Sequence, residues 1–444
     1  MMSIVSERIS DLLDHISVEE LKIGCRMEKT DFTRKSRLNF VNLVMFIIAN
    51  TGKSLTMELV CFFYNLGELE VTKEALSQRR LKLKSLVFKK LWNFYLEKVY
   101  ENPSKIKLFH GCLLMAGDGS KTELPFHKKL IEIFGGSENK IGEITKCMGN
   151  SSTLYDVLNH YIFDFEIDTY KTSEKTLIYR NLKNLFRIKF LKQYKKIFIL
   201  DRGYPSIEFF YYLIKKNEKF VFRLKKSAYK KEKARLRNDD QYIDIEITKN
   251  RMNHIKDLKL KAELLEKEKL NLRIIQYKLT TGEIEYLITN LDKKDFKHKD
   301  IVEIYHLRWG IEGSFKTLKS GLKFENISGY SKLVVEQDMY SQILVYNIIK
   351  DIENKSQKIK DFKNKNSKFK KKKQGKINTH IVIGHFKLFI ISIYKEIERK
   401  ARIKIISPLI LKLTKFYTNT STKKRERPEN TPHRKNPTNN RKLF

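Results

Sequence analysis

The stretch from Tyr305 to Lys319 holds side chains whose types and spacing suit phosphate chemistry. Tyr305, Arg308, Glu312 and Lys319 follow one another at intervals of three, four and seven residues. In an α-helix, which turns about 100° per residue, these four fall within an arc of roughly 60°. One carboxylate then lies among a guanidinium, an ammonium and a phenol. Such a group can hold a metal ion through the acid and a phosphate through the basic side chains.

An ordinary solvent-exposed helix face is the alternative interpretation of this stretch, because acids and bases four residues apart pair on many helices. Two isolated aspartates upstream favour the chemical interpretation. Asp118 follows the apolar run Leu108–Ala116, and Asp201 follows Lys196–Leu200. Each aspartate alone could be a turn residue or a helix cap. Their coincidence with the strand order described below favours a catalytic role.

Length and charge bound the class of protein. The chain has 444 residues, enough for two or three domains, and 41% of them are hydrophobic. Its formal net charge of +38 indicates a polyanionic partner, with nucleic acid the first candidate and an anionic membrane surface the second. No apolar run is long enough to span a membrane, and no signal-peptide pattern begins the chain. The four scattered cysteines are typical of reduced thiols, so we expect a cytoplasmic protein.

Residues 1–105 have the pattern of a helical N-terminal domain, for which DNA binding is one interpretation. Within it, the segment 72–80 could be a short basic helix after a tight turn, as in a helix-turn-helix motif. Arg79 and Arg80 would then enter the major groove. A charged helix in an ordinary bundle has equal weight.

Residues 106–225 alternate between strands and helices in the order β-β-β-α-β-α-β, which predicts an α/β fold. Asp118 and Asp201 each come at the end of a predicted strand. In open α/β sheets, chemistry gathers at the carboxyl ends of strands. The helix that carries Glu312, within residues 296–355, completes this core.

The remaining segments flank or interrupt the core. Residues 226–295 predict a β-rich insertion with a hairpin turn at Thr281-Gly282. Three segments follow the core: a Lys-rich linker (356–378), a C-terminal helical region (379–417) and a basic disordered tail (418–444).

Three carboxylates gathered by such a core can hold two divalent cations about 3.5–4 Å apart, one activating the attacking oxygen and one stabilising the leaving oxygen. Oxygen ligands favour Mg2+, with Mn2+ able to substitute. We therefore predict Asp118, Asp201 and Glu312 as metal-binding catalytic residues. Arg308 and Lys319 would hold phosphate oxygens. Tyr305 would bind a phosphate or orient Glu312.

The stretch from Tyr305 to Lys319 resembles the Y-(2)-R-(3)-E-(6)-K signature of the insertion-sequence-4 family of transposases, with a match at all four positions. Asp118 within Gly117–Ser120 and Asp201 within Leu200–Tyr204 resemble the first two catalytic aspartates of that family. The resemblance covers roughly residues 110–350.

This resemblance implies a bacterial DDE transposase with a ribonuclease-H-like catalytic core. It implies cut-and-paste transposition of an insertion sequence: strand cleavage at terminal inverted repeats, then attack of the freed 3′-OH on target DNA. The partners would be double-stranded DNA, as element ends and target, and a second copy of the chain in a synaptic dimer, at the bacterial nucleoid. Two alternatives remain: a metal-dependent DNA nuclease on the same core, and a catalytically inactive DNA-binding relic.

Overall fold

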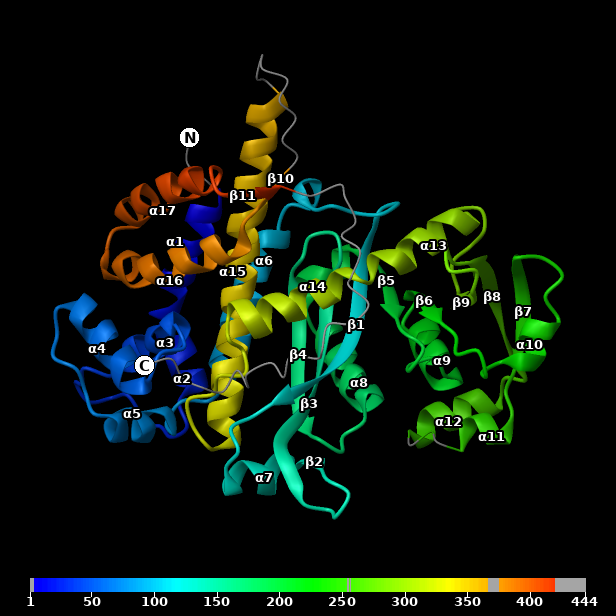
Figure 1. Ribbon diagram of the computed structural model, residues 1–444, viewed down its shortest axis with the longest axis horizontal. Coiled ribbons are helices and arrows are strands. Elements are labelled where there is room, and N and C mark those ends of the chain that lie inside the picture. The colour runs from blue at the N-terminus through cyan, green and yellow to red at the C-terminus, as the bar shows by residue number, and fades with distance from the viewer. Residues whose placement is uncertain (1–3, 254, 256, 366–374, 420–444) are drawn as a thin grey trace, which may run out of the picture.

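A nine-stranded mixed sheet forms the centre of the computed structural model, which describes residues 4–253, 255, 257–365 and 375–419 (Figure 1). The strand order is β2-β3-β1-β5-β6-β9-β8-β7, with β4 paired to β3. The strands are β1 (Cys112–Glu123), β2 (Gly136–Glu138), β3 (Ile144–Asp156), β4 (Ile162–Thr169), β5 (Lys195–Leu200), β6 (Lys219–Arg223), β7 (Asp240–Glu246), β8 (Lys269–Lys278) and β9 (Ile284–Thr289).

Three parallel strands, β1, β5 and β6, lie in the middle of this sheet. β5 is buried almost throughout, as expected of a short apolar strand with neighbours on both sides. Antiparallel strands extend the sheet in both directions, β3 and β4 beyond β1 and β9 to β7 beyond β6. The chain is therefore a mixed α/β protein, which agrees with the predicted fold class at this level.

Helices before, between and after the strands complete the core. α8 (Glu174–Leu185) packs on β1, β3 and β4, and the Ser173 side chain caps its first turn. α13 (His298–Leu307) packs on β6, and α14 (Gly310–Lys316) packs on β1. The shorter elements of the core are η1 (Pro103–Lys105), α7 (Lys128–Phe134), η2 (Lys189–Gln193), α9 (Ile207–Lys215) and the π-helical turn η3 (Thr317–Gly321).

The first and last helices of the described chain form one helical body beside the sheet, blue and orange in Figure 1. α1 packs on α17, and the long helix α15 packs on α3, α6, α16 and α17. The members of this body are α1 (Ile4–Ile16), α2 (Glu19–Cys25), α3 (Phe40–Ala49), α4 (Leu55–Leu66), α5 (Lys73–Arg80), α6 (Leu86–Tyr100), α15 (Lys332–Lys365), α16 (Thr379–Lys395) and α17 (Arg399–Leu413).

Asp351 of α15 joins this helical body to the sheet. Its carboxylate accepts hydrogen bonds from Arg8 (2.8 and 3.0 Å), Tyr95 (2.9 Å) and Tyr161 (3.0 Å). All four residues are buried. Buried charges are tolerated when they are paired and hydrogen-bonded in this way.

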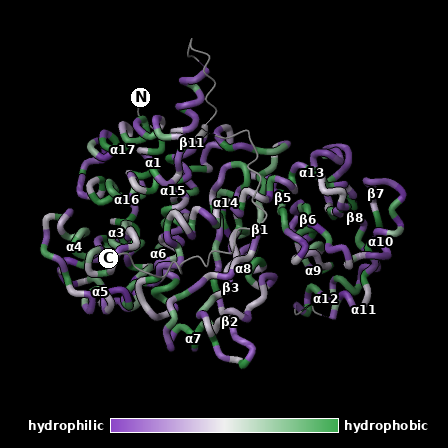
Figure 2. The backbone as a smooth tube through the Cα atoms, in the orientation of Figure 1, coloured by the Kyte–Doolittle hydropathy of each residue, from purple (hydrophilic) through white to green (hydrophobic). Residues whose placement is uncertain are grey.

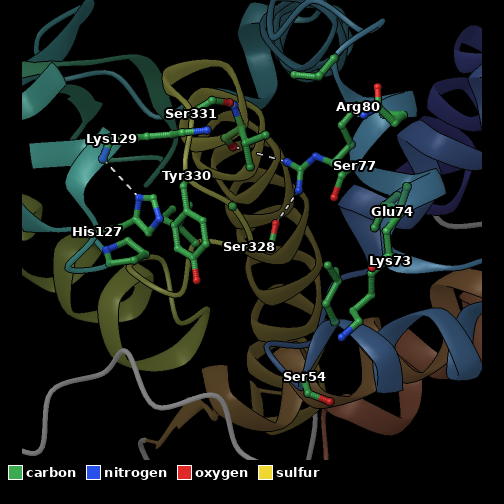
Figure 3. A pocket seen from close by; sticks show the side chains of 18 of the residues that line it. Ser54, Lys73, Glu74, Ser77, Arg80, His127, Lys129, Ser328, Tyr330 and Ser331 are labelled. Atoms are coloured by element: carbon green, nitrogen blue, oxygen red, sulfur yellow. Dashed lines mark hydrogen bonds between the residues drawn. The ribbon is translucent and has the colours of Figure 1, made fainter. Parts of the chain in front are cut away.

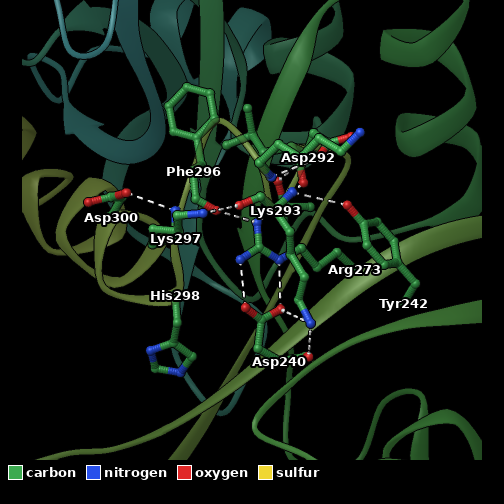
Figure 4. A network of polar contacts seen from close by, with 12 residues as sticks. Asp240, Tyr242, Arg273, Asp292, Lys293, Phe296, Lys297, His298 and Asp300 are labelled. Atoms are coloured by element: carbon green, nitrogen blue, oxygen red, sulfur yellow. Dashed lines mark hydrogen bonds and ion pairs between the residues drawn. The ribbon is translucent and has the colours of Figure 1, made fainter.

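The β-rich insertion joins the central sheet through β9, which pairs with β6. The predicted hairpin turn is confirmed, with Gly282 at φ +86° between β8 and β9. The segment also contains α10 (Lys230–Ala234), α11 (Lys249–Met252) and α12 (Leu258–Leu265). Buried Arg273 of β8 forms two 2.7 Å hydrogen bonds to Asp240 and one of 2.7 Å to the carbonyl of Phe296, so it fastens the insertion to the segment before α13 (Figure 4).

The predicted linker from residue 356 begins as helix, because α15 continues through Lys365. Ser356 and Lys360 are still buried in the helical body, and Lys360 donates to the carbonyl of Gly375 at 2.6 Å. The final turns project from the molecule and are hydrophilic (Figure 2). β10 (Gly375–Ile377) then pairs with β11 (Tyr417–Asn419). The lysine run at 370–373 and the tail from 420 lie outside the described residues.

Nowhere in the described part of the chain does a helix combine the length and the apolar content that a membrane crossing requires.

Candidate active site

Asp118 and Asp201 lie side by side on two neighbouring parallel strands. Gly117 of β1 is in register with Leu200 of β5. Asp118 directly follows Gly117 and Asp201 directly follows Leu200, so the two aspartates are neighbours across the strands. The sequence predicted that Asp118 lies just past the end of its strand, and this is wrong. β1 continues to Glu123 because β3 pairs with it along that whole length. Asp201 does follow its strand directly, as predicted.

Arg308 bridges the two carboxylates. Its guanidinium nitrogens lie 3.8 Å from Asp118 and 3.9 Å from Asp201. Its side chain is 4% exposed, so the attraction acts in a medium of lower polarity than water. The Nε atom of Arg308 is buried and has no hydrogen-bond partner within the described structure. The site therefore has a spare donor beside its two acids.

Asp201 is held more firmly than Asp118. It accepts hydrogen bonds from the backbone N–H of Arg202 (2.6 Å), from Arg223 Nε (2.8 Å) and from the Tyr305 hydroxyl (2.9 Å). Asp118 accepts one, from the backbone N–H of Gly119 at 2.9 Å. The two carboxylates therefore have different protonation chemistry.

Burial raises the pKa of Asp118 to about 6, and the nearby Arg308 charge only partly opposes this rise. Burial also acts to raise the pKa of Asp201. There, the hydrogen bond from the Arg202 N–H and the charges of Arg308 and Arg223 outweigh it, so the pKa of Asp201 is lowered. Near pH 6 the pair thus combines one firmly ionised acid, Asp201, with one that is partly protonated, Asp118. Groups with such separated pKa values are frequent at functional sites.

Close packing explains the two glycines that flank Asp118. A Cβ atom on Gly117 would lie 2.5 Å from Leu200 Cδ2 of the neighbouring strand. A Cβ atom on Gly119 would lie 2.7 Å from the carboxyl carbon of Glu174. Glycine at both positions therefore lets β1 approach β5 and the start of α8.

Arg223 and Glu174 belong to this site although the sequence analysis did not select them. Arg223 ends β6, the next parallel strand after β5, and it also pairs with Glu285 at 2.6 Å. The rule that selected Asp201, position at the carboxyl end of a parallel strand, would have found Arg223. Glu174 accepts a 3.4 Å hydrogen bond from Tyr204. No sequence pattern indicates that the start of α8 reaches Gly119.

The predicted single helix from Tyr305 to Lys319 is interrupted. α13 ends at Leu307 and α14 begins at Gly310. Across the junction the N–H groups of Arg308 and Trp309 bond to carbonyls three residues earlier, at 3.1 and 3.3 Å. Such bonds wind the chain at 3.0 residues per turn in place of 3.6, so the following side chains rotate away from the predicted stripe.

The four signature residues differ in burial and in contacts. Tyr305 and Arg308 are buried beside the aspartates, whereas Glu312 is exposed on the first turn of α14. Lys319 lies on η3, donates to the carbonyl of Lys121 at 2.8 Å and pairs with Glu325 at 3.1 Å. The structure thus brings together Asp118, Asp201, Tyr305 and Arg308, and it holds Lys319 near the far end of β1.

A divalent cation such as Mg2+ needs several oxygen ligands from this site. Asp118 and Asp201 supply the oxygen ligands that Mg2+ prefers. However, within the described residues no three His, Cys, Asp or Glu side chains come close enough to share a metal ion. Arg308 approaches both aspartates, and Glu312 is exposed on α14. This arrangement therefore does not form the predicted three-carboxylate metal site.

Arg80 is buried and Arg79 is half-buried, unlike the exposed side chains of a DNA-reading pair. Arg80 is 3% exposed and donates to Gln337 (2.8 Å) and Asp338 (2.6 Å). It also donates to Ser328 (Figure 3). Arg79 donates to the carbonyl of Leu38 at 2.7 Å. These contacts tie Arg80 to α15 and Arg79 to the chain before α3, so the predicted role of the two arginines in DNA binding stays a prediction that this arrangement does not favour. The alternative interpretation, a charged helix in a bundle, describes α5.

Comparison with known families identifies the wider class. A family model described as "Transposase DDE domain" matches residues 126–348, just over half of the chain. The chain belongs to this family. Membership indicates an enzyme that cleaves and transfers DNA, in agreement with the class that the sequence predicted. The match includes Asp201 and the four signature residues, and Asp118 lies shortly before it.

One solved structure aligned with this transposase is titled "Cryo-EM structure of piggyBac transposase synaptic complex with hairpin DNA (SNHP)". The alignment has 10% identity, covers 91% of this chain and 82% of that chain, and gives a TM-score of 0.46. A comparison with curated proteins found no match.

Proposed function

We propose that this protein is the transposase of a bacterial insertion sequence of the insertion-sequence-4 type. It cuts DNA at terminal inverted repeats and joins the freed 3′-OH to target DNA. The observation that carries the proposal is the pair Asp118 and Asp201 on neighbouring strands, with Tyr305 and Arg308 of the signature stretch in contact with them. The family match supports the class of reaction.

Asp118, Asp201 and Glu312 are proposed as the catalytic residues, with Mg2+ as the cofactor and Mn2+ able to substitute. DDE transposases generally use divalent metal ions, and carboxylates are suitable ligands for them. Since Glu312 is exposed and Arg308 lies between the aspartates, the proposal requires a local rearrangement of the helix junction at Arg308-Trp309 when DNA and metal bind.

Tyr305, Arg308 and Lys319 are proposed to bind phosphate oxygens of the DNA. Arg308 has a buried Nε without a hydrogen-bond partner in the described structure, which a phosphate oxygen could satisfy. Its guanidinium can donate two parallel hydrogen bonds to two phosphate oxygens. A phosphate that engages Arg308 would also weaken its attraction to Asp118 and Asp201.

The wider assignments form part of the same proposal. The sheet with α8 and α13 to α14 is proposed as a ribonuclease-H-like core interrupted by residues 226–295, with residues 1–105 as a helical N-terminal unit. The partners are double-stranded element ends and target DNA, bound by a homodimer at the bacterial nucleoid in the cytoplasm. The net charge of +38 supports the DNA partner.

The decisive experiment incubates purified protein with the DNA that flanks its reading frame, in Mg2+ and in EDTA. We expect metal-dependent cuts at a repeat by wild type, and no cuts by Glu312→Ala. Glu303→Ala is the matched control, since Glu303 is an exposed acid on the preceding helix α13. Cleavage that survives Glu312→Ala, or that persists in EDTA, would refute the proposed chemistry.

The products separate the two alternative functions. Cuts without strand-joined products would indicate a metal-dependent nuclease on the same core. Tight DNA binding without nicking in Mg2+ or Mn2+ would indicate an inactive DNA-binding relic. Joined products from a donor repeat and a target plasmid support transposition.

A further inference from the structure

A basic groove lies where the parallel strands β1, β5 and β6 begin, at the opposite end of these strands from the aspartate pair. Its volume is about 860 Å3. Five lysines and three acidic residues line it, together with His110, Cys112 and Phe296. The lysines are Lys192, Lys195, Lys196, Lys216 and Lys219.

The parallel strands place these lysines together. Cys112 at the start of β1 is in register with Lys195 at the start of β5, and Lys219 begins β6 beside Ile197. Because these strands are parallel, they all begin at one end of the sheet and run towards the other end, where Asp118 and Asp201 lie. At about 3.3 Å per residue along β1, the groove is about 20 Å from Asp118. The two sites are therefore separate.

Four of the five lysines in the groove are accessible to a ligand. Lys196 is buried and pairs with Glu218 at 3.1 Å. The other four lysines of the groove are exposed. Exposed lysines are long, mobile point charges suited to phosphate oxygens on a polymer backbone.

One wall of the groove is rigid. The carbonyl of Phe296 accepts the 2.7 Å hydrogen bond from buried Arg273, which Asp240 holds from its other side (Figure 4). The ring of His110 stacks on Phe296, with centroids 5.3 Å apart. The lysines thus stand around a preformed surface, which reduces the entropy lost on binding.

We propose that this groove binds the phosphate backbone of a DNA duplex, distinct from the segment engaged at Asp118 and Asp201. The inference rests on the proposed function, because transposition requires an element end and a target DNA to be held at the same time. Its contribution is electrostatic and independent of sequence.

Lysine acetylation footprinting tests the groove directly. Protein is labelled with an acetylating reagent in the absence and presence of a saturating random-sequence duplex, and modification is read by mass spectrometry. We expect the duplex to suppress acetylation of Lys195 and Lys219, also in Arg308→Gln protein, while exposed Lys404 and Lys412 of α17 stay reactive. Unchanged reactivity of the groove lysines, or suppression by heparin but not by the duplex, would overturn the proposal.

The salt dependence of binding provides the quantitative test. The groove variant replaces Lys192, Lys195, Lys216 and Lys219 by Gln. The control variant replaces four exposed lysines of α16 and α17, Lys395, Lys400, Lys404 and Lys412, and loses the same charge. Each lost phosphate contact makes the plot of log K against log salt less steep by about 0.9. We therefore expect the slope for the groove variant to be about 3.6 less steep than the slope for wild type. Equal slopes in the two variants, both confirmed as folded by thermal melting, would overturn the proposal.

These measurements separate the groove from the proposed reaction. If the duplex protects the groove lysines but no metal-dependent cleavage occurs, the groove binds DNA and the proposed reaction is refuted. If metal-dependent cleavage occurs but the groove lysines stay unprotected, the proposed reaction is supported and DNA binding by the groove is refuted.

Discussion

Asp118 and Asp201 lie on neighbouring parallel strands and share one guanidinium, that of Arg308. The register of β1 with β5 sets their separation, and the junction between α13 and α14 supplies the arginine. Substitutions in this site, and in the elements that pack around it, have distinct expected effects.

Tyr305→Phe removes the 2.9 Å hydrogen bond to Asp201 and keeps the ring. We expect DNA cleavage to fall about 10–100-fold, as when other groups that orient a ligand carboxylate are lost, with little change in melting temperature. The measurement is the initial cleavage rate on a terminal-repeat duplex. Tyr242→Phe is the control. The Tyr242 hydroxyl accepts a hydrogen bond from the N–H of Lys293, so this variant also loses one tyrosine hydrogen bond, but within the insertion. Equal rates for the two variants would contradict an orienting role for Tyr305.

Lys319→Gln removes one cation from the signature stretch. We expect the slope of log K against log salt for DNA binding to fall by about 0.9, the value of one phosphate contact. Because Lys319 also pairs with Glu325, the melting temperature should fall too, and Lys319→Arg should recover most of both losses. A slope unchanged in folded Lys319→Gln protein would remove Lys319 from the DNA contacts.

Arg80→Ala tests the structural role of α5. Loss of a buried charge partner leaves Asp338 unpaired, which costs about 3–5 kcal/mol of unfolding free energy. Lys73→Ala, an exposed substitution on the same helix, should change it by no more than about 0.5 kcal/mol. Urea unfolding of both variants provides the comparison. Normal stability of Arg80→Ala with relaxed sequence specificity would instead restore the DNA-reading interpretation.

Gly117→Ala should destabilise the protein by about 1–3 kcal/mol, since the new methyl group overlaps Leu200 and Ile178. The strain would separate β1 from β5 and reduce cleavage as well. Gly313→Ala is the matched control: no atom lies within 4 Å of its added Cβ, and alanine favours the helix by up to about 1 kcal/mol. Thermal melts that rank the two variants in the opposite order would show that β1 and β5 are not tightly packed at this point.

His160 should make the fold sensitive to acid. Burial, with nearby lysine charges, lowers the pKa of His160 to about 4, and its ring nitrogen lies 2.8 Å from the Tyr155 hydroxyl. The unfolded chain binds the proton more tightly, so this contribution is complete above about pH 6.5 and is lost as the pH falls towards 4. The loss is at most about 3 kcal/mol.

His160→Gln should remove this part of the pH dependence, measured as the difference in urea midpoint between pH 7 and pH 4.5. His380→Gln, at an exposed position, is the control. An unaltered pH dependence in His160→Gln, with the same profile as His380→Gln, would assign the acid sensitivity to other groups.

Local patterns predicted much of the sheet. The antiparallel pair β3–β4, the buried strand β5 and the hairpin β8–β9 all follow from residues close together in the sequence, including Gly282 at positive φ. Asp201 was placed correctly because strand β5 ends directly before it. Asp118 was misplaced because β3, distant in sequence, extends β1 beyond it.

The sequence by itself determined the DDE transposase class and the alternation of strands and helices, because these depend on residue type and short-range spacing. Only the tertiary structure decided which of the predicted site residues meet. Arg80 is buried because Gln337 and Asp338 reach it from α15, and the signature stretch is not one continuous helix because the chain tightens at Arg308-Trp309. Burial and helix junctions depend on packing between segments that are far apart in the chain. Residue spacing within one segment carries no information about those partners.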